Sequence, residues 1–178
     1  MVNRIFYYYN LQRYYNYQPI KQALFACFYY LCSLKLHYMQ KYISTQLFRY
    51  EVTNGVSEYH AMLRVTEPRL TYTEQVDHLL TAYQHLLETE LPGTVAVFKR
   101  FFLSDAANQA NYLLATQVEH SGCALSIVEQ PPLDGTKIAL WVYLQKGVNT
   151  RALPHGDYEV SHGGYRHIWS GYNFNKAS

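Results

Sequence analysis

The stretch Ser126–Trp141, SIVEQPPLDGTKIALW, decides the fold that this sequence predicts. Its two ends are short apolar runs containing β-branched residues, and such runs are typical of strands. Pro-Pro and Asp-Gly dipeptides lie between the runs, and both mark turns. The stretch therefore predicts a hairpin with strands over 123–130 and 137–145. One carboxylate, Glu129, lies at the rim of the first strand.

The region before this hairpin has the pattern of an α+β domain. Two short strand-like runs flank Asn54-Gly55, a dipeptide favoured in hairpin turns. Apolar residues at helical spacing follow, then an apolar strand, then an alanine-rich helix. The expected order is strand 47–52, strand 58–66, helix 72–91, strand 94–103 and helix 106–118. Together with the hairpin, this order predicts a single mixed β-sheet with two helices packed on one face.

The helix over 72–91 has a clear start signal. Thr71 is followed three residues later by Glu74, which is the spacing of a capping box. Pro92-Gly93 marks its end. Its less apolar face carries His78 and His85, which we expect to be exposed to solvent rather than to bind a metal.

The strand over 94–103 is apolar on both faces except at Lys99-Arg100. Such a run is typical of a central strand covered on both sides. One of these two cations must therefore occupy a special position. For Arg100 we expect an ion pair with an acidic side chain, at a subunit interface; anion binding is the alternative.

The N-terminal region differs sharply from the rest in charge. Residues 1–50 carry six Lys or Arg side chains and no Asp or Glu, whereas 51–178 carry nine basic and thirteen acidic side chains. We therefore separate a basic, Tyr-rich extension over 1–45 from a domain over 46–147. The extension is interpreted as sequence upstream of a start at Met39, or as a short apolar helix over 20–38.

Two other interpretations of the extension remain open. Its tyrosines interleave with arginines, and aromatic stacking beside basic groups is how single-stranded nucleic acids are held. The apolar run 23–34, ALFACFYYLCSL, is twelve residues long, whereas a bilayer span needs roughly 20. We expect neither nucleic-acid binding nor a membrane span. Three cysteines, an odd number without a metal-type pairing, fit reduced thiols in the cytoplasm better than a disulfide framework.

The segment 148–178 begins with a loop-like run and then contains one or two strand-like runs over 158–170. We interpret it as a linker and the first strand of a second domain that is missing or truncated. The chain would then be half of a longer protein.

Three runs resemble the Rid family, the YjgF-like proteins long labelled endoribonuclease L-PSP. They are TEQVDHLLTAYQHLLE (73–88), VAVFKRFFLSDAANQANYL (95–113) and LSIVEQPPLDGTKIALWVYL (125–144). The run GGYRHIWSGYNFN (163–175) resembles the junction between two Rid-like domains in chorismatase-like proteins. The resemblance implies a trimer, or a pseudo-trimer of two-domain chains, with clefts between subunits.

The resemblance also implies where catalytic groups would lie. Active members hydrolyse enamine and imine intermediates, and they hold the substrate carboxylate with an Arg at the start of the strand equivalent to 123–130. That position falls on Cys123 or Ala124 here. The Glu of the following strand would fall within 139–141, ALW, which has no carboxylate. Enamine hydrolysis is therefore not inferred for this chain.

The remaining candidate site residues have weaker patterns. Cys123 lacks an adjacent cationic residue that would activate a thiol, so a buried structural role is favoured. Glu129 could act as a general base, but an ordinary solvated strand end is the simpler interpretation. Arg166, His167 and Trp169 have the side chains of a pocket for a planar acidic ligand.

No metal and no other cofactor is predicted. His155, His162 and His167 match no established ligand spacing.

Three functions follow as hypotheses. The first is a divergent Rid-like domain with a structural, oligomerising or small-acid-binding role, forming a homo-oligomer. The second is a hydrolase or deaminase of enamine, imine or chorismate-like small acids. The third is a membrane-tethered or nucleic-acid-binding protein acting through residues 1–50.

Overall fold

A computed structural model describes residues 41–51, 55–117, 122–154 and 157–170, all within one compact unit that spans residues 40–178. Residues 1–40, which include Met39 and most of the predicted extension, lie outside the described residues, as does His155. In the described ranges no helix is long and apolar enough to cross a membrane.

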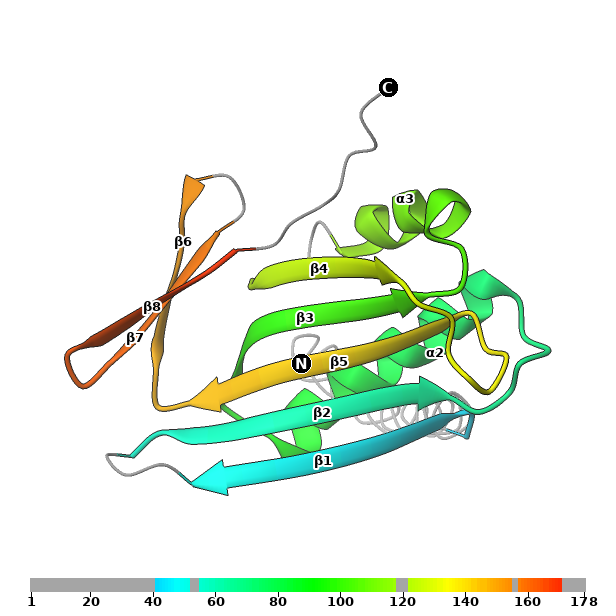
Figure 1. Ribbon diagram of the computed structural model, residues 1–178. Helices are drawn as coiled ribbons and strands as arrows, with labels where there is room; N and C mark the ends of the chain where they lie inside the picture. The colour runs from blue at the N-terminus through cyan, green and yellow to red at the C-terminus, as the bar shows by residue number, and fades with distance from the viewer. Residues whose placement is uncertain (1–40, 52–54, 118–121, 155–156, 171–178) are drawn as a thin grey trace, which may run out of the picture. The chain divides into compact units, whose positions relative to one another are not determined.

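The main sheet has five strands and is mixed, as predicted. Its order is β1-β2-β5-β3-β4, in which β3 and β4 are parallel and the other neighbours antiparallel (Figure 1). The strands are β1 (Ile43–Glu51), β2 (Ser57–Val65), β3 (Val95–Leu103), β4 (Ala124–Glu129) and β5 (Ile138–Lys146).

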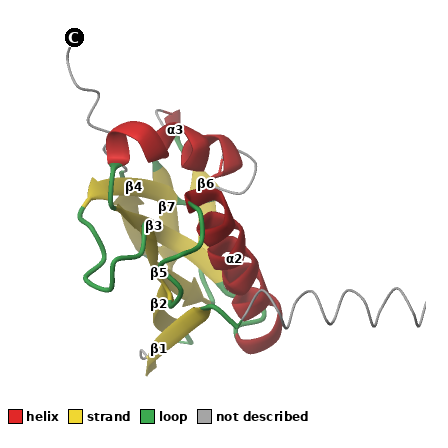
Figure 2. Cartoon of the chain, turned by 90° about the vertical axis from the view of Figure 1, so that its right-hand side faces the viewer, coloured by secondary structure: helices red, strands yellow, loops and turns green. Residues whose placement is uncertain are grey.

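Two helices lie on one side of this sheet, which confirms the predicted layer arrangement (Figure 2). They are α2 (Tyr72–His85) and α3 (Ala106–Gln117). A π-helical segment, η1 (Leu86–Glu90), continues α2, and it ends where the Leu91 amide donates to the carbonyl of Leu86.

The start of α2 is the predicted capping box. The Thr71 hydroxyl accepts from the Glu74 amide at 3.3 Å, and the Glu74 carboxylate accepts from the Thr71 amide at 2.8 Å. The Thr71 hydroxyl also donates to the Glu74 carboxylate at 2.7 Å, and this bond, followed by the one from the Thr71 amide, holds the pKa of the Glu74 carboxyl below its usual value. Because Glu74 is fully exposed, the bonds define where the helix begins rather than supply much stability.

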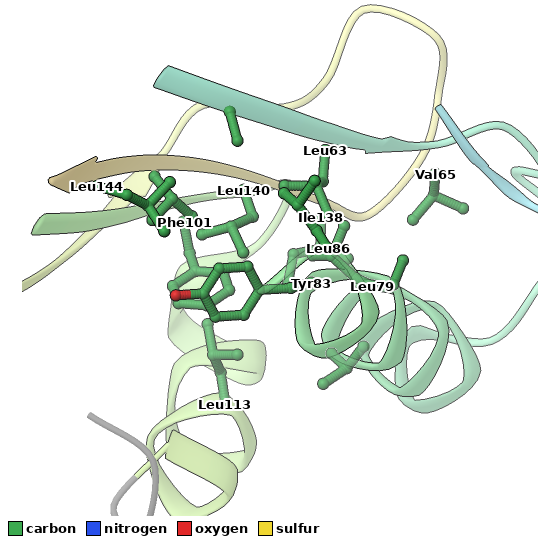
Figure 3. Close-up of a cluster of buried hydrophobic side chains, with 14 of the residues drawn as sticks. Leu63, Val65, Leu79, Tyr83, Leu86, Phe101, Leu113, Ile138, Leu140 and Leu144 are labelled. Carbon is green, nitrogen blue, oxygen red and sulfur yellow. The ribbon is translucent and has the colours of Figure 1, made fainter. Parts of the chain in front are cut away.

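The main core lies between the helices and the sheet. Alternate residues of β2, from Tyr59 to Val65, point into it, as the sequence alternation predicts. Figure 3 shows Leu79, Tyr83 and Leu86 of α2 and η1, with Leu113 of α3, packed against the strands. The other labelled residues are Leu63, Val65, Phe101, Ile138, Leu140 and Leu144.

One prediction for α2 is wrong. His78 is buried, and its ring lies edge-on to Tyr42 with centroids 5.2 Å apart. It is therefore not part of a solvated face. Tyr42 and the strand that follows it cover this side of the helix, a long-range contact that helical periodicity does not reveal.

The predicted hairpin over Ser126–Trp141 is also wrong, although both strands form. β4 pairs with β3 only, and β3 lies between β4 and β5. The connection crosses the end of β3: the Gln130 amide donates to the carbonyl of Leu103, and the Ser104 amide to the carbonyl of Lys137. Eight residues, 130–137, separate the strands, enough to pass over a neighbour, whereas hairpin loops most often have two to five residues.

The C-terminal region forms a second sheet of three antiparallel strands, β6 (Asn149–Ala152), β7 (Tyr158–His162) and β8 (Tyr165–Trp169). Two strands over 158–170 agree with the sequence pattern. β6, by contrast, lies where a loop was expected. Its four residues are exposed and do not alternate between apolar and polar. The local sequence therefore gives no strand signal, and β6 is recognised by its pairing with β7.

Candidate functional site

The side of the main sheet opposite α2 and α3 is the first candidate functional surface. We call it the open face. The second sheet packs on part of it, through Val160 and Trp169. Side-chain alternation brings the even-numbered residues of β1, β2 and the later part of β3 to this side, together with the odd-numbered residues of β5.

A row of aromatic rings crosses the open face. The His60 ring stacks on Tyr143 with centroids 4.8 Å apart and on Trp141 at 5.7 Å. Tyr50 meets His60 edge-on at 5.8 Å. Phe98 continues the row beyond Trp141, with centroids 5.9 Å apart. These rings come from four adjacent strands, so the sheet holds them in a fixed array.

The edge of this row is exposed. Phe48 and Tyr50 of β1 have 56% and 55% of their surface accessible. Single exposed apolar residues are ordinary, but an apolar group continuous with a ring array is typical of an interaction surface.

Two arginines lie on the same face. The Arg100 guanidinium carbon is 5.4 Å from the centroid of the Phe98 ring, and the Arg100 Nε atom is buried without a hydrogen-bond partner. Arg64 lies on β2, opposite Ala139 of β5. Among the described residues no carboxylate forms an ion pair with either arginine. The expected acid partner of Arg100 is therefore not found within the described part of the chain.

A cleft of about 320 Å³ opens beside Arg64. Met62, Phe102 and Ala139 line it from the sheet, and the loop residues 130–134 complete it. One cation at the edge of an apolar cleft can hold a small carboxylate.

At the end of the open face away from the Arg64 cleft, hydrogen bonds hold polar side chains of β2 and β5 in place. Gln145 Nε2 donates to the Tyr143 hydroxyl at 2.8 Å and to the Glu58 carboxylate at 3.2 Å. Burial raises the pKa of the Tyr143 phenol, with a further contribution from Glu58. The phenol is therefore protonated at neutral pH and does not supply a base.

The structure gives Glu129 an identifiable structural contact. It lies at the exposed end of β4, and its carboxylate accepts from the Ala106 amide at 3.1 Å, at the first residue of α3. Together with Asp105, whose side chain accepts from the Asn108 amide, it satisfies amides that a helix start leaves without partners.

Cys123 is buried beside β4 and is a free thiol. Burial raises its pKa, partly offset by Lys99. A protonated buried thiol is a weak nucleophile.

The C-terminal candidates do not form one pocket. Arg166 is exposed and lies 3.5 Å from the Glu159 carboxylate, which also pairs with Arg151. His167 stacks on His162 at 6.0 Å. Trp169 instead packs against Phe98 and Tyr143, with centroids 5.7 and 5.4 Å away. Alternation along β8 places Arg166 on one side and His167 with Trp169 on the other.

In the described ranges no three His, Cys, Asp or Glu side chains form a metal-binding group.

Sequence reasoning missed the ring array and Arg64, and it did not decide which of Lys99 and Arg100 is buried. In the sequence, the rings of the array appear only as alternate residues of separate strands: His60 in one, Trp141 and Tyr143 in another. They come together because β5 lies beside β2, and the sequence does not reveal that strand order.

Comparisons with models of known protein families, with curated proteins and with solved structures find no match to this chain.

Proposed function

We propose that this chain is a divergent Rid-like domain with a mainly structural role, and that it forms homo-oligomers through the open face. The observation that carries the proposal is the aromatic row with its exposed edge at Phe48 and Tyr50, beside Arg100, whose buried Nε has no hydrogen-bond partner among the residues that the structure describes. A second copy would cover Phe48 and Tyr50 and could supply a hydrogen-bond acceptor to Arg100. Aromatic residues and Arg are enriched at such interfaces.

Two further features support this proposal over a catalytic one. The positions at which the Rid resemblance would place an Arg and a Glu hold Cys123 or Ala124 and the apolar run 139–141. The helices already cover the other side of the sheet. A trimer is the assembly that the resemblance implies, with a pseudo-trimer if the full protein carries a second such domain.

Sedimentation velocity and light scattering test the association directly. We expect the chain to sediment at about three times its subunit mass of 20.8 kDa. Tyr50→Glu should weaken association at least tenfold, or roughly 1.4 kcal/mol, because it places a charge within the aromatic row. Tyr112→Glu, at an exposed tyrosine of α3 in the helix layer, is the matched control and should leave association unchanged. A wild-type chain that stays monomeric at all attainable concentrations would contradict the proposal.

Small-acid binding is the second candidate function, and the cleft beside Arg64 favours it. A small carboxylic acid would lie against Met62 and Phe102 with its carboxylate on the guanidinium. Titration with short aliphatic and aromatic carboxylates, followed by amide chemical shifts, should perturb residues 130–134 and the β2 strand. Arg64→Met should abolish these shifts, whereas Arg151→Met, at an exposed arginine of β6, should not. Equal shifts in both variants would exclude the cleft.

A further inference from the structure

The floor of the cleft beside Arg64 has a small side chain between two large ones. Arg64 of β2 is the register partner of Ala139 in β5, and Ala139 is in turn the partner of Phe102 in β3. These three residues therefore form one row across the open face, with the methyl group of Ala139 at its centre. Met62, two positions before Arg64, adds a further apolar side chain to the lining.

The wall of the cleft is the loop over 130–134, and local hydrogen bonds orient its last residue. The Asp134 carboxylate accepts from the Thr136 hydroxyl at 2.6 Å and from the Thr136 amide at 3.2 Å. Thr136 is itself buried, so the turn that carries Asp134 is anchored in the protein. Both bonds are accepted by Oδ1, and no described residue donates to Oδ2. The second oxygen is therefore available to a ligand.

The cleft has one cation and one carboxylate among its lining residues, and they do not neutralise each other. Arg64 and Asp134 both line it, yet no ion pair joins them or joins either to another described residue. Leu133, at the rim, is an apolar side chain fully exposed to solvent. An arginine donates two parallel hydrogen bonds to a carboxylate, whereas an aspartate accepts from an ammonium group. A ligand that carries both charged groups would match both side chains and place an apolar group on Met62 and Phe102.

We propose that the cleft binds a free amino acid with a branched aliphatic side chain, held by Arg64 at its carboxylate and by Asp134 at its ammonium group. The inference rests on the small-acid function proposed above for this cleft, and it names the class of acid. A cleft of about 320 Å³ with a mostly apolar lining holds a compact molecule of this kind. The site lies at the Arg64 end of β2, whereas Phe48 and Tyr50 lie beside the other end. Binding is therefore separate from the exposed rings through which copies would associate.

Three ligands that share one carbon skeleton test which charges are recognised. They are L-leucine, 4-methylpentanoate, which lacks the ammonium group, and 3-methylbutylamine, which lacks the carboxylate. Each is titrated into the full chain at pH 7.5, and the amide chemical shifts of β2 and of residues 133–135 give the dissociation constants. We expect leucine to bind about fivefold more tightly than either of the others, or better, because each charge adds one ion pair and exposed pairs contribute modestly.

Two variants identify the partner of the ammonium group. Asp134→Asn keeps a side-chain oxygen that can accept from Thr136, but it removes the negative charge. It should weaken leucine binding about fivefold and should not weaken binding of 4-methylpentanoate, which has no ammonium group. Glu90→Gln, at an exposed carboxylate of η1 in the helix layer, is the matched control and should change neither affinity.

The outcomes separate this inference from the small-acid function. If 4-methylpentanoate binds the wild type as tightly as leucine does, the ammonium group is not recognised, and the inference is wrong while small-acid binding stands. The same conclusion follows if Asp134→Asn binds leucine as the wild type does. Loss of both acids in Asp134→Asn would mean that Asp134 shapes the cleft and does not select the ammonium group, which also contradicts the inference.

Two results would overturn the inference and the small-acid function together. One is that neither acid perturbs the cleft of the wild type, and the other is that 3-methylbutylamine binds as tightly as leucine. Association through the open face is measured independently by sedimentation, so that proposal can stand or fall alone.

Discussion

Among the described glycines, Gly147 is the one at which a side chain would meet a backbone clash. Its φ angle is +83°, a region that residues with a side chain rarely adopt. A Cβ atom added there would clash with the carbonyl oxygen of Gly55. The chain leaving β5 therefore passes so close to the loop between β1 and β2 that only a hydrogen fits.

Gly147→Ala should consequently lower the free energy of unfolding by about 3 kcal/mol, from left-handed backbone strain plus the clash. Gly135→Ala is the matched control, since Gly135 has φ of +76° but nothing within 4 Å of an added Cβ. It should cost about 1 kcal/mol. Urea unfolding of both variants measures the difference. Equal losses would mean that the contact with Gly55 relaxes without cost.

At the level of residues, the sequence predicted correctly which apolar side chains of a strand point into the core, but it predicted poorly which polar side chains are buried. The burial of alternate residues in β2, which include Tyr59, Leu63 and Val65, followed from their spacing. The burial of His78 did not, because the sequence marks it as polar and gives no sign of the chain that covers it. For Lys99 and Arg100 the predicted central strand required one cation in a special position but did not decide which of the two would be buried. A lysine's long aliphatic stem allows it to occupy an apolar position, so residue type alone does not decide its environment.

The elements were predicted more reliably than their neighbours in space. The capping box at Thr71 and the positions of five strands could be read from local patterns, because a helix start and a strand depend on residues a few positions apart. Strand order depends on contacts between distant segments. β4 and β5 are consecutive and apolar, yet β5 is inserted between β2 and β3.

The connection over 130–137 shows why the hairpin prediction failed. Pro131 and Pro132 lack amide hydrogens, so they cannot continue a ladder between two strands. The Asp134 side chain instead accepts from the backbone and the hydroxyl of Thr136, which closes a local turn. The predicted turn does form. The connection that contains it passes over the end of β3, however, and does not bring β5 back beside β4.

On the scale of the whole molecule, the second sheet is joined to the first by a small aromatic cluster. Trp169 packs on Phe98 and Tyr143, and Val160 is buried with them. The sequence shows no sign of this contact, since the segment 148–178 is interpreted from it as a linker and the first strand of a second domain. In the candidate site the sequence identified Arg100 but not the rings around it, because those rings are assembled by sheet order.

Trp169→Ala should loosen the second sheet while the main sheet stays folded. Removing the half-buried ring should cost about 2 kcal/mol of local stability, so amide hydrogen exchange over 149–169 should accelerate at least tenfold. Ile168→Ala, at the neighbouring exposed residue on the other side of β8, is the control, with an expected change below about 0.5 kcal/mol. Faster exchange in all five strands of the main sheet would show instead that the two sheets unfold as one unit.

The position of Trp169 has a practical consequence for spectroscopy. The chain contains two tryptophans, Trp141 and Trp169, and both contact Phe98. Intrinsic indole emission will therefore report on this one neighbourhood of the open face. Events confined to α2 or α3 would leave the emission nearly unchanged, so a probe placed on the helix layer is needed to follow them.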